Sequence, residues 1–536
     1  MRPLTWAFKE RPQTRKTDGK TTDPFEPAEP GIDCLFPTHA YLEAMTVHFP
    51  FEHTYAALPA NFFARVAPTP VAAPRLIKLN RPLAIHLGLD PDRLASREGT
   101  EILAGKRVPE GADPIAMAYA GHQFGHFVPQ LGDGRAILLG EVIDADGIRR
   151  DIQLKGSGPT PFSRRGDGRA ALGPVLREYI VSEAMARLGI PTTRSLAAVM
   201  TGESVLRETP LPGAVLTRVA SSHIRVGTFQ YFAARGDTEG VRRLADHVIG
   251  RHYPDLAHAD RPYHALLDSV IARQADLVAR WLLVGFIHGV MNTDNTSISG
   301  ETIDYGPCAF MDHYDPAKVF SSIDELGRYA YANQPRIALW NLTRLAECLL
   351  PLLGDEQDKT IEEAQSALGN FVETFDAAYQ AGLRKKLGLF AVRDDDRALA
   401  QDLLDTMAKN QADFTLTFRR LSDAALAPAD DGTVRELFAD PNAYDEWAGR
   451  WRQRIGDEPQ DPAARQAAMR SVNPAFIPRN HLIEAVIEAA VNGDDFAPFE
   501  ELLTVLSKPY EDQSGFARYA QAPEPHQRVL RTFCGT

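Results

Sequence analysis

The stretch HGVMNTDNTSISGETIDYGPCAF, residues 288–310, decides how the rest of the chain is interpreted. It places Asn295 in a polar run and then the triplet DYG at residues 304–306, with a short turn between them. Asn and Asp side chains supply hard oxygen ligands, which suit Mg²⁺ when it bridges phosphate oxygens. We therefore predict a metal site formed by Asn295 and Asp304.

The order of these residues is that of the catalytic segment of protein kinases, in which H-R-D-L-x-x-x-N is followed by D-F-G. Kinases use that Asn and the second Asp to hold metal ions, and the first Asp to accept the proton of the substrate hydroxyl. Val290 stands where this base should be, and a valine cannot accept a proton. Asp294 is the carboxylate beside Asn295, and we predict that it is the base; the alternative is that it caps the turn.

The composition excludes several classes of protein. The chain has 536 residues, of which 44% are hydrophobic and 24% charged, as in a typical globular protein. Its net charge of −13 argues against a nucleic-acid partner, which needs a basic surface. Four cysteines do not make a disulfide framework, and no apolar run approaches the ~20 residues that span a membrane. We therefore expect a cytoplasmic enzyme with neither a membrane nor a nucleic acid as partner.

Three segments of the chain differ in composition and pattern. Residues 1–47 are rich in Pro, Thr and charge without a clear period, and we predict a disordered extension there. Residues 48–235 hold short β-type runs separated by glycine turns, and residues 236–536 are mostly helical in pattern. This order predicts an α+β fold, with a β-rich N-terminal lobe followed by a larger helical C-terminal lobe.

The strongest local patterns are a hairpin and a series of helices. Alternating apolar residues on either side of a turn predict two strands over residues 136–155. Apolar residues at helical spacing predict an amphipathic helix over 174–190, with Pro174 near its start and Gly189 near its end. Further helices are expected over 265–291, 335–353, 360–388, 396–426 and 481–506.

The hairpin and the helix after it carry residues suited to phosphate binding. Gly132 and Gly134 flank an aspartate before the first strand; glycines let backbone N–H groups approach phosphate oxygens, and Arg135 adds charge. Lys155, in I-Q-L-K, matches the V-A-I-K lysine of kinases, whose partner is a glutamate of the next helix, here Glu178. The alternative is that these are ordinary turn and surface residues.

Arginines and histidines form further candidate clusters. The loop RRGDGRA, residues 164–170, surrounds an aspartate with three arginines, which suits triphosphate binding or else forms an exposed basic loop. Arg218 and Arg225 lie on strand-like sequence, where they either cap strands or point into one cleft. The run GHQFGHF, residues 121–127, lacks the glutamate of the H-E-x-x-H zinc motif, and we predict a structural loop there.

Long strings of this sequence resemble the selenoprotein O family, whose bacterial members are YdiU-type proteins. The strings are YAGHQFGHFVPQLGDGRAILLGE (119–141), DIQLKGSGPTPFSRRGDGRAALGPVLREYIVSEAM (151–185), TRVASSHIRVGTFQ (217–230), GFIHGVMNTDNTSISGETIDYGPCAFMD (285–312) and NPAFIPRNH (473–481). The resemblance implies a protein-kinase-like fold of two lobes. It also implies an enzyme that transfers AMP from ATP to Ser, Thr or Tyr hydroxyls of proteins.

The resemblance implies a role for each candidate residue as well. ATP would lie reversed in the cleft, and Mg²⁺, or Mn²⁺ in its place, would be held by Asn295 and Asp304. Asp294 would be the base, and Lys155 and Glu178 would form the lysine–helix pair. The residues around the nucleotide would be Gly132, Gly134, Arg135, Lys155, Glu178, Asp167, Gly168, Arg218, Arg225 and Asp304.

The resemblance further implies a redox role for two cysteines. Members of the family often carry selenocysteine or cysteine three residues from the C-terminus, and Cys534 stands there. Cys308 follows the predicted metal ligand Asp304 closely in the sequence. We expect a reversible Cys308–Cys534 disulfide that ties the tail over the active site, and redox proteins among the protein substrates.

Two other functions are open at this stage: a protein kinase with a relocated base, and a non-catalytic pseudokinase that binds ATP as a scaffold. The candidate metal ligands and Lys155 argue against a scaffold, and Val290 argues against a kinase. A reversed ATP would bury its β- and γ-phosphates, which then need compensating cations. The abundance of arginine therefore favours transfer of AMP.

Overall fold

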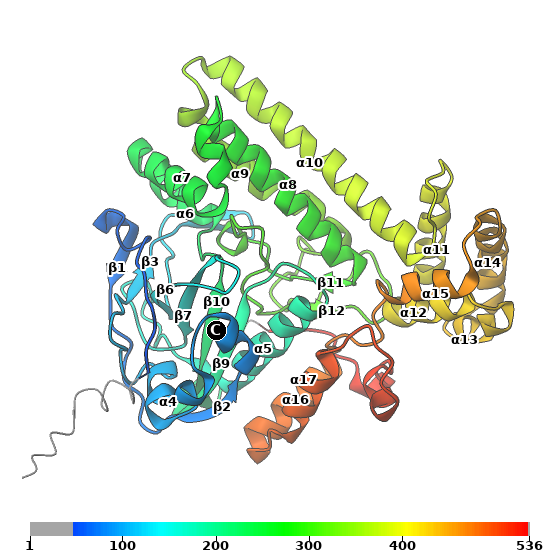
Figure 1. Cartoon of the computed structure of the whole chain (residues 1–536), viewed down its shortest axis with the longest axis horizontal. Helices are drawn as coiled ribbons and strands as arrows, with labels where there is room; N and C mark the ends of the chain where they lie inside the picture. The colour runs from blue at the N-terminus through cyan, green and yellow to red at the C-terminus, as the bar shows by residue number, and fades with distance from the viewer. Residues whose placement is uncertain (1–46, 534–536) are drawn as a thin grey trace, which may run out of the picture. The chain divides into compact units, whose positions relative to one another are not determined.

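A sheet of antiparallel strands occupies the N-terminal part of the protein (Figure 1). The computed structural model describes residues 47–533; the predicted extension before Val47 and the tail residue Cys534 lie outside these residues. The strand order is β1-β3-β6-β7-β10-β9-β2, and β8 pairs with β10. The strands are β1 (Phe63–Arg65), β2 (Arg75–Leu79), β3 (Ile115–Met117), β6 (Ala136–Ile143), β7 (Arg149–Lys155), β8 (Ala170–Ala171), β9 (Arg194–Leu206) and β10 (Pro210–Ala220).

The predicted hairpin is confirmed as β6 and β7, inside the sheet. Its register pairs Ala136 with Lys155. The turn is closed by Asp144, whose Oδ1 accepts hydrogen bonds from the N–H groups of Asp146 (3.0 Å) and Ile148 (2.8 Å). An aspartate that bonds the backbone of its own turn fixes the geometry of the loop, and the register of the strands follows from it. Lys155 is thereby set at the end of β7.

Helix α5 (Leu172–Arg187) confirms the helix predicted over 174–190 and packs on β9 and β10. Most of its residues are buried, and Glu178 is among them. The helix ends just before Gly189, which has a φ of +77°, a conformation that glycine adopts at little cost. Because a buried glutamate needs a partner, Glu178 requires a cation from the sheet beneath the helix.

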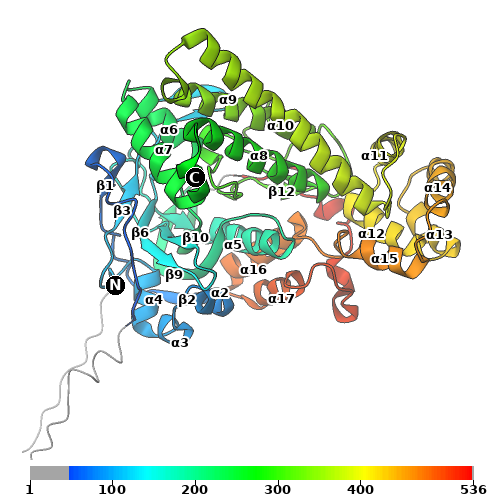
Figure 2. The same cartoon turned by 45° about the horizontal axis from the view of Figure 1, so that its top comes forward.

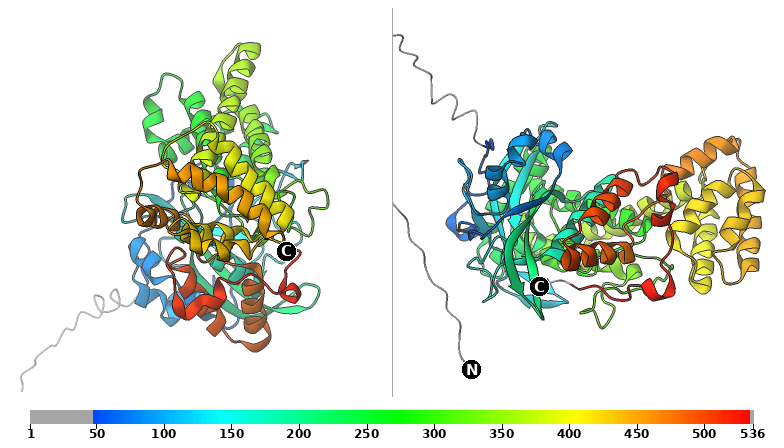
Figure 3. Two further views of the ribbon diagram at one scale, coloured as in Figure 1. Left: turned by 90° about the vertical axis from the view of Figure 1, so that its right-hand side faces the viewer. Right: turned by 90° about the horizontal axis from the view of Figure 1, so that it is seen from below.

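Helices dominate the chain after the sheet. Helices α8, α9 and α10 pack against one another, and α16 and α17 pack on α5 (Figure 2). Figure 3 shows α11 to α15, in yellow and orange, on the side of the described residues away from the sheet. Between Val47 and Phe533, no helix combines the length and the apolar character needed to cross a membrane.

The remaining elements have the following bounds. The helices are α2 (Arg81–His86), α3 (Pro91–Leu94), α4 (Arg97–Leu103), α6 (Val226–Ala233), α7 (Thr238–His252), α8 (Pro262–Leu283), α9 (Gln334–Leu353), α10 (Gln357–Lys386), α11 (Asp396–Asn410), α12 (Phe414–Ala424), α13 (Asp431–Arg435), α14 (Pro441–Gly456), α15 (Pro462–Arg470), α16 (Asn480–Gly493) and α17 (Ala497–Leu506). Two short hairpins are formed by β4 (Gly121–Gln123) with β5 (His126–Val128), and by β11 (Phe286–Ile287) with β12 (Ala309–Phe310).

Three of the predicted helices have different bounds in the structure. The pattern over 265–291 ends as a helix at Leu283, because the chain turns at Gly285 and enters β11. The patterns over 396–426 and 481–506 are each two helices. They break at Gln411 and Asp494, which have φ of +52° and +50°. The helices predicted over 335–353 and 360–388 are confirmed as α9 and α10.

The motif NPAFIPRNH ties the C-terminal helices to the segment that follows DYG. Arg479 is fully buried and donates hydrogen bonds to Asp312 (2.5 Å) and Asp413 (2.8 and 3.2 Å). Asn480, at the start of α16, donates through Nδ2 to the carbonyl oxygen of Phe310 on β12 (3.1 Å). A buried cation between two carboxylates must stay paired, so this cluster fixes where β12 lies.

Replacement of this arginine should destabilise the fold. We expect Arg479→Met to lower the stability by about 3–5 kcal/mol, because it leaves buried carboxylates without a cation. The matched control is Arg393→Met, which removes an exposed ion pair with Asp457 at 2.8 Å and should cost about 1 kcal/mol or less. Urea and thermal unfolding compare the two variants with the unaltered protein. Equal losses in both would contradict the anchoring role of Arg479.

Candidate active site

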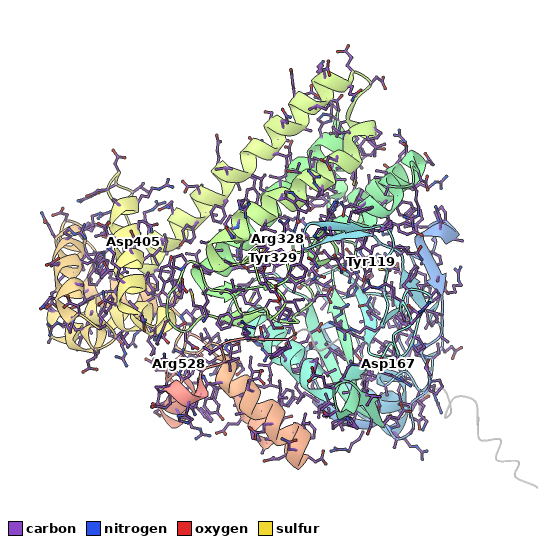
Figure 4. All side chains as sticks on the ribbon, turned by 180° about the vertical axis from the view of Figure 1, so that it is seen from behind. Tyr119, Asp167, Arg328, Tyr329, Asp405 and Arg528 are labelled. Atoms are coloured by element: carbon purple, nitrogen blue, oxygen red, sulfur yellow. The ribbon has the colours of Figure 1, made fainter. Side chains whose placement is uncertain are left out.

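The residues predicted to bind the nucleotide and the metal, except Glu178, come together around one cavity. Its volume is about 730 Å³. It is lined by Gly132, Gly134, Arg135, Lys155, Asp167, Gly168, Arg218, Arg225, Asp294, Asn295 and Asp304. Glu178 lines an adjoining cavity of about 560 Å³, which shares Arg135 and Lys155 with the first. Tyr119 and Asp167, which both line the larger cavity, lie in the part of the molecule that contains the sheet (Figure 4).

Asp304 is the centre of a cluster of cations. Its Oδ1 accepts hydrogen bonds from Arg218 (2.5 Å) and Lys155 (3.2 Å), and its Oδ2 lies 3.5 Å from Nη2 of Arg225. Burial by itself would raise the pKa of Asp304, but the charges of these three cations hold the pKa well below its usual value. Asp304 is therefore a carboxylate, and its φ of +62° is an uncommon conformation for a residue with a Cβ.

The predicted pair of Lys155 and Glu178 is present. Nζ of Lys155 lies 2.5 Å from Oε2 of Glu178, and Nη1 of Arg218 lies 3.4 Å from Oε1 of the same carboxylate. The side chain of Arg218 is also held by Gln153 on the neighbouring strand, whose Oε1 accepts hydrogen bonds of 3.1 and 2.5 Å. The glutamate of α5 and the cations of β7 and β10 thus satisfy one another, which fixes both basic side chains beside Asp304.

Arg218 and Arg225 point into the same cavity, and the extended backbone predicted for both is present, with Arg225 forming an isolated β-bridge with Ser297. Arg218 lies on β10, whereas Arg225 precedes helix α6 as its N-terminal cap. The guanidinium of Arg225 lies 3.4 Å from Asp133 and 4.4 Å from the ring centre of Tyr119. Both arginines are 2% exposed or less, so their charge is held deep in the protein.

The loop between the glycines is shaped by a close contact. Gly132 has a φ of +72°, and a Cβ there would lie 2.3 Å from the ring of Phe162. Asp133 is buried between Gly132 and Gly134, and its Oδ2 accepts hydrogen bonds from the N–H of Met117 (3.2 Å) and from Gln153 (3.1 Å). Glycine is required here because the loop passes directly against an aromatic ring.

The basic loop after β7 contributes a second group of charges, and one of its partners was missed by the sequence analysis. Arg207, at the end of β9, donates hydrogen bonds of 2.8 and 3.3 Å to Asp167. The hydrogen bond from Arg207 lowers the pKa of Asp167 below its ordinary value. Arg207 belongs to no motif, and only the pairing of β9 with β10 brings it to the cavity.

The charge of the cavity suits a polyanion. Among the described residues that line it, seven are basic and four are acidic. The basic ones are Arg135, Lys155, Arg164, Arg169, Arg207, Arg218 and Arg225. Guanidinium groups bind phosphate oxygens through paired hydrogen bonds, and buried phosphates need such partners.

Asn295 and Asp304 fit a divalent cation by their chemistry. Nδ2 of Asn295 donates a hydrogen bond to the carbonyl oxygen of Val290 (3.0 Å). Because Nδ2 and Oδ1 lie on opposite sides of the amide group, Oδ1 of Asn295 points away from Val290. The amide oxygen and the Asp304 carboxylate line the same cavity and are hard donors. Mg²⁺ uses hard oxygen donors of this kind when it bridges phosphate oxygens. The basic side chains nearby can bind the same phosphates.

Asp294 lies in a turn of 3₁₀ helix, residues 293–295, and is 8% exposed. Its Oδ2 accepts a hydrogen bond from Nε2 of Gln123 (3.2 Å), and its Oδ1 is buried with no hydrogen-bond partner. Burial raises the pKa of Asp294 to about 6, and the hydrogen bond from Gln123 opposes this rise. Val290, at the place of the kinase base, is buried and lines the cavity.

The predicted cysteine pair is described in part. Cys308 is buried beside Pro307, whereas Cys534 lies outside the described residues. The last described residues run next to this segment: Thr532 donates through Oγ1 to the carbonyl oxygen of Pro307 (2.5 Å). Thr532 also exchanges backbone hydrogen bonds with Phe320 (2.7 Å) and Ser322 (2.9 Å). Thr532 therefore lies next to the segment that carries Asp304.

Comparison with known proteins agrees with this site. A family model described as protein adenylyltransferase SelO matches residues 45–507. A protein nucleotidyltransferase YdiU of Bradyrhizobium diazoefficiens is 78% identical over 492 residues, which cover 92% of this chain and 100% of that protein. Proteins of the same name from another Bradyrhizobium and from Rhodopseudomonas palustris are 77% and 75% identical over the same shares.

These similarities define the class of protein as a nucleotidyltransferase. The chain belongs to the protein adenylyltransferase SelO family, and the resemblance to the selenoprotein O family in its sequence is thereby confirmed.

A substitution in the glycine loop should weaken nucleotide binding. The Cβ added by Gly132→Ala forces the loop away from Phe162. To bind ATP, the loop must return to its original conformation, which is strained in the variant and costs about 1–3 kcal/mol of binding free energy. We expect the Kd for ATP, measured by calorimetry, to rise about 10- to 100-fold. The control is Gly147→Ala, in the β6–β7 turn, where φ is +77° but no atom lies within 4 Å of the new Cβ. If both variants bind ATP equally well, the contact with Phe162 does not shape the site.

Proposed function

We propose that the protein transfers AMP from ATP to Ser, Thr or Tyr hydroxyls of proteins, with release of pyrophosphate. The observation that carries the proposal is the pair of buried arginines, Arg218 and Arg225, which converge with Lys155 on Asp304. Adenylyl transfer requires attack at the α-phosphorus. An ATP with its β- and γ-phosphates deepest in the cavity exposes that phosphorus, and buried arginines offset the charge of the phosphates.

We also propose that the fold is that of a protein kinase, with a lobe of residues 48–235 and a lobe of residues 236–536. Its support is the order of the parts along the chain: a glycine loop, a strand lysine, a helix glutamate, and the segment that holds Asn295 and Asp304. The contact between Lys155 and Glu178 is that expected of the strand lysine and the helix glutamate. A cytoplasmic location belongs to the same proposal, because ATP is the substrate.

In this scheme Asn295 and Asp304 hold Mg²⁺, for which Mn²⁺ can substitute. A bound metal ion supplies charge that neutralises phosphate oxygens. Asp304 would ligate the metal ion through its carboxylate, and Lys155, Arg218 and Arg225 would bind phosphate oxygens. The other contacts to the nucleotide come from Gly132, Gly134, Arg135, Asp167 and Gly168, and Glu178 orients Lys155.

Asp294 accepts the proton of the attacking hydroxyl. It lines the same cavity as the proposed metal ligands, and it is adjacent to Asn295. Most of the rate enhancement in such a reaction comes from positioning and from charge stabilisation, so a carboxylate is a sufficient base. The hydroxyl proton moves to Asp294, and pyrophosphate leaves from the deep end of the cavity.

The function is tested with ATP that carries a label on either the α- or the γ-phosphate. Transfer of the α-label alone to protein is the expected result with Mg²⁺ present. Transfer of the γ-label alone would identify a protein kinase with a relocated base. Transfer of neither would identify an ATP-binding scaffold. Either of the last two results contradicts the proposal.

Substitution of the two aspartates should separate metal binding from proton transfer. Asp304→Ala should abolish transfer of the α-label. Asp294→Asn should lower kcat about 100-fold or more, while the Kd for ATP stays unchanged. The matched control is Asp255→Asn, at an exposed position, which should keep full activity. Full activity of Asp304→Ala or Asp294→Asn would refute the role assigned to that residue.

We further propose that Cys308 and Cys534 form a reversible disulfide that regulates the enzyme, and that redox proteins are among its substrates. The support is the tail, which Thr532 attaches to Pro307 and to residues 320–322. Oxidised glutathione would take up the two electrons and two protons of the thiols as the S–S bond forms.

Peptide mapping after treatment with oxidised glutathione tests this disulfide. We expect Cys308 and Cys534 in one linked peptide, and release of the link by dithiothreitol. Cys348 is the control, because burial raises the pKa of its thiol to about 12 and it should stay reduced. Recovery of both Cys308 and Cys534 as thiols from the oxidised protein would exclude the regulatory disulfide.

A further inference from the structure

The run GHQFGHF was predicted to be a structural loop, and the structure gives it a more specific place. It forms the hairpin of β4 and β5, in which Gly121 pairs with Val128 and Gln123 with His126. The hairpin lies against the segment Asn292–Asp294, and Gln123 also lines the catalytic cavity. The hairpin is therefore part of the wall beside the proposed base.

Three consecutive side chains of the segment each accept a hydrogen bond from this hairpin. The contacts are the N–H of Phe124 to Oδ1 of Asn292 (3.1 Å), the N–H of His122 to Oγ1 of Thr293 (2.7 Å), and Nε2 of Gln123 to Oδ2 of Asp294 (3.2 Å). Two of these donors are backbone groups, and the third is a side chain. The hairpin is thus attached to the segment independently of the side chain of Gln123.

Other contacts also hold the hairpin without Gln123. The hydroxyl of Tyr329 donates to Oδ1 of Asn292 (2.7 Å) and accepts from the N–H of Phe124 (3.2 Å). Gln230 bonds both Thr293 (2.6 Å) and the ring of His122 (2.8 Å). Tyr329 belongs to a separate loop, and its ring centre lies 5.1 Å from that of Phe124 in the turn of the hairpin. Loss of the Gln123 amide should therefore leave the backbone of the hairpin in place.

The approach of the hairpin to Asp294 is close because glycine lies at the contact. A Cβ on Gly121 would lie 2.6 Å from Oδ1 of Asp294, and a Cβ on Gly227 would lie 3.3 Å from its Cα. Oδ1 is buried next to Gly121 and has no hydrogen-bond partner among the described residues. Of the two carboxylate oxygens, Oδ2 is the one left to meet a hydroxyl in the cavity, and it is the oxygen that Gln123 bonds.

We propose that Gln123 is a positioning residue for the transfer reaction. A carboxylate turns easily about its last torsion, so an enclosed Oδ1 and a bonded Oδ2 together hold one orientation. The hydrogen bond from Gln123 occupies one lone pair of Oδ2 and directs the other toward the cavity. This inference rests on the proposed function of Asp294 as the base, and it adds the group that aims that base.

The test uses two variants that remove the donor and keep the size of the side chain. Gln123→Met and Gln123→Glu should each lower kcat for transfer of the α-label by about 10- to 100-fold, because a misaligned base costs a large part of the rate. The KM for ATP and the melting temperature should stay unchanged. The matched control is His126→Ala, which removes an exposed side chain from the same hairpin and should keep full kcat.

A double substitution separates positioning from a structural role. In the Asp294→Asn background, Gln123→Met should lower kcat less than about 2-fold, because residues that act as one unit are not additive. The inference is overturned by full kcat in Gln123→Met, by a rise in the KM for ATP that accounts for the loss, or by multiplicative losses in the double variant.

The results that would refute the proposed function differ from those that would refute the role of Gln123. No transfer of the α-label by the unaltered protein, or full activity in Asp294→Asn, refutes the role of Asp294 and this inference with it. Activity that depends on Asp294 but not on Gln123 refutes the inference alone.

Discussion

The need to neutralise one partly buried carboxylate organises the half of this protein that holds the cavity. Asp304 is bonded by a lysine of β7 and by two arginines, one from β10 and one from the start of α6. Each of these cations is held by a further acid or amide, so the sheet, α5 and the DYG segment are joined by charge. A buried charge is tolerated only when it is paired, and so the ion pairs that stabilise the site also prepare it to bind phosphate.

The two sides of the cavity have different characters as a result. One side is a group of cations around Asp304, namely Lys155, Arg218 and Arg225. The other is the segment Asn292–Asp294, which is bonded mainly to neutral groups of the β4–β5 hairpin. Strong charge on one side and neutral hydrogen bonds on the other suit the proposed reaction between a polyanion and a neutral hydroxyl.

The sequence was sufficient to predict the β6–β7 hairpin, helix α5 and most of the charged residues that line the cavity, because each lies in a motif with fixed local geometry. It was not sufficient for Arg207 and Gln123, which reach the site through strand pairing and hairpin packing. Arg225 has the extended backbone that was expected, but it is the N-cap of α6 rather than a residue of one of the named strands. Gln411 and Asp494 break predicted helices by single left-handed residues, for which apolar spacing carries no signal.

The anchor at Arg479 and Asn480 has a consequence for the order in which the protein is made. These residues hold β12 and Asp312, which follow the proposed metal ligands directly, yet they come far later in the chain. A ribosome delivers the sheet, α5 and the DYG segment well before it delivers their anchor. During synthesis, the segment after DYG therefore gains this anchor only once the C-terminal helices have been made.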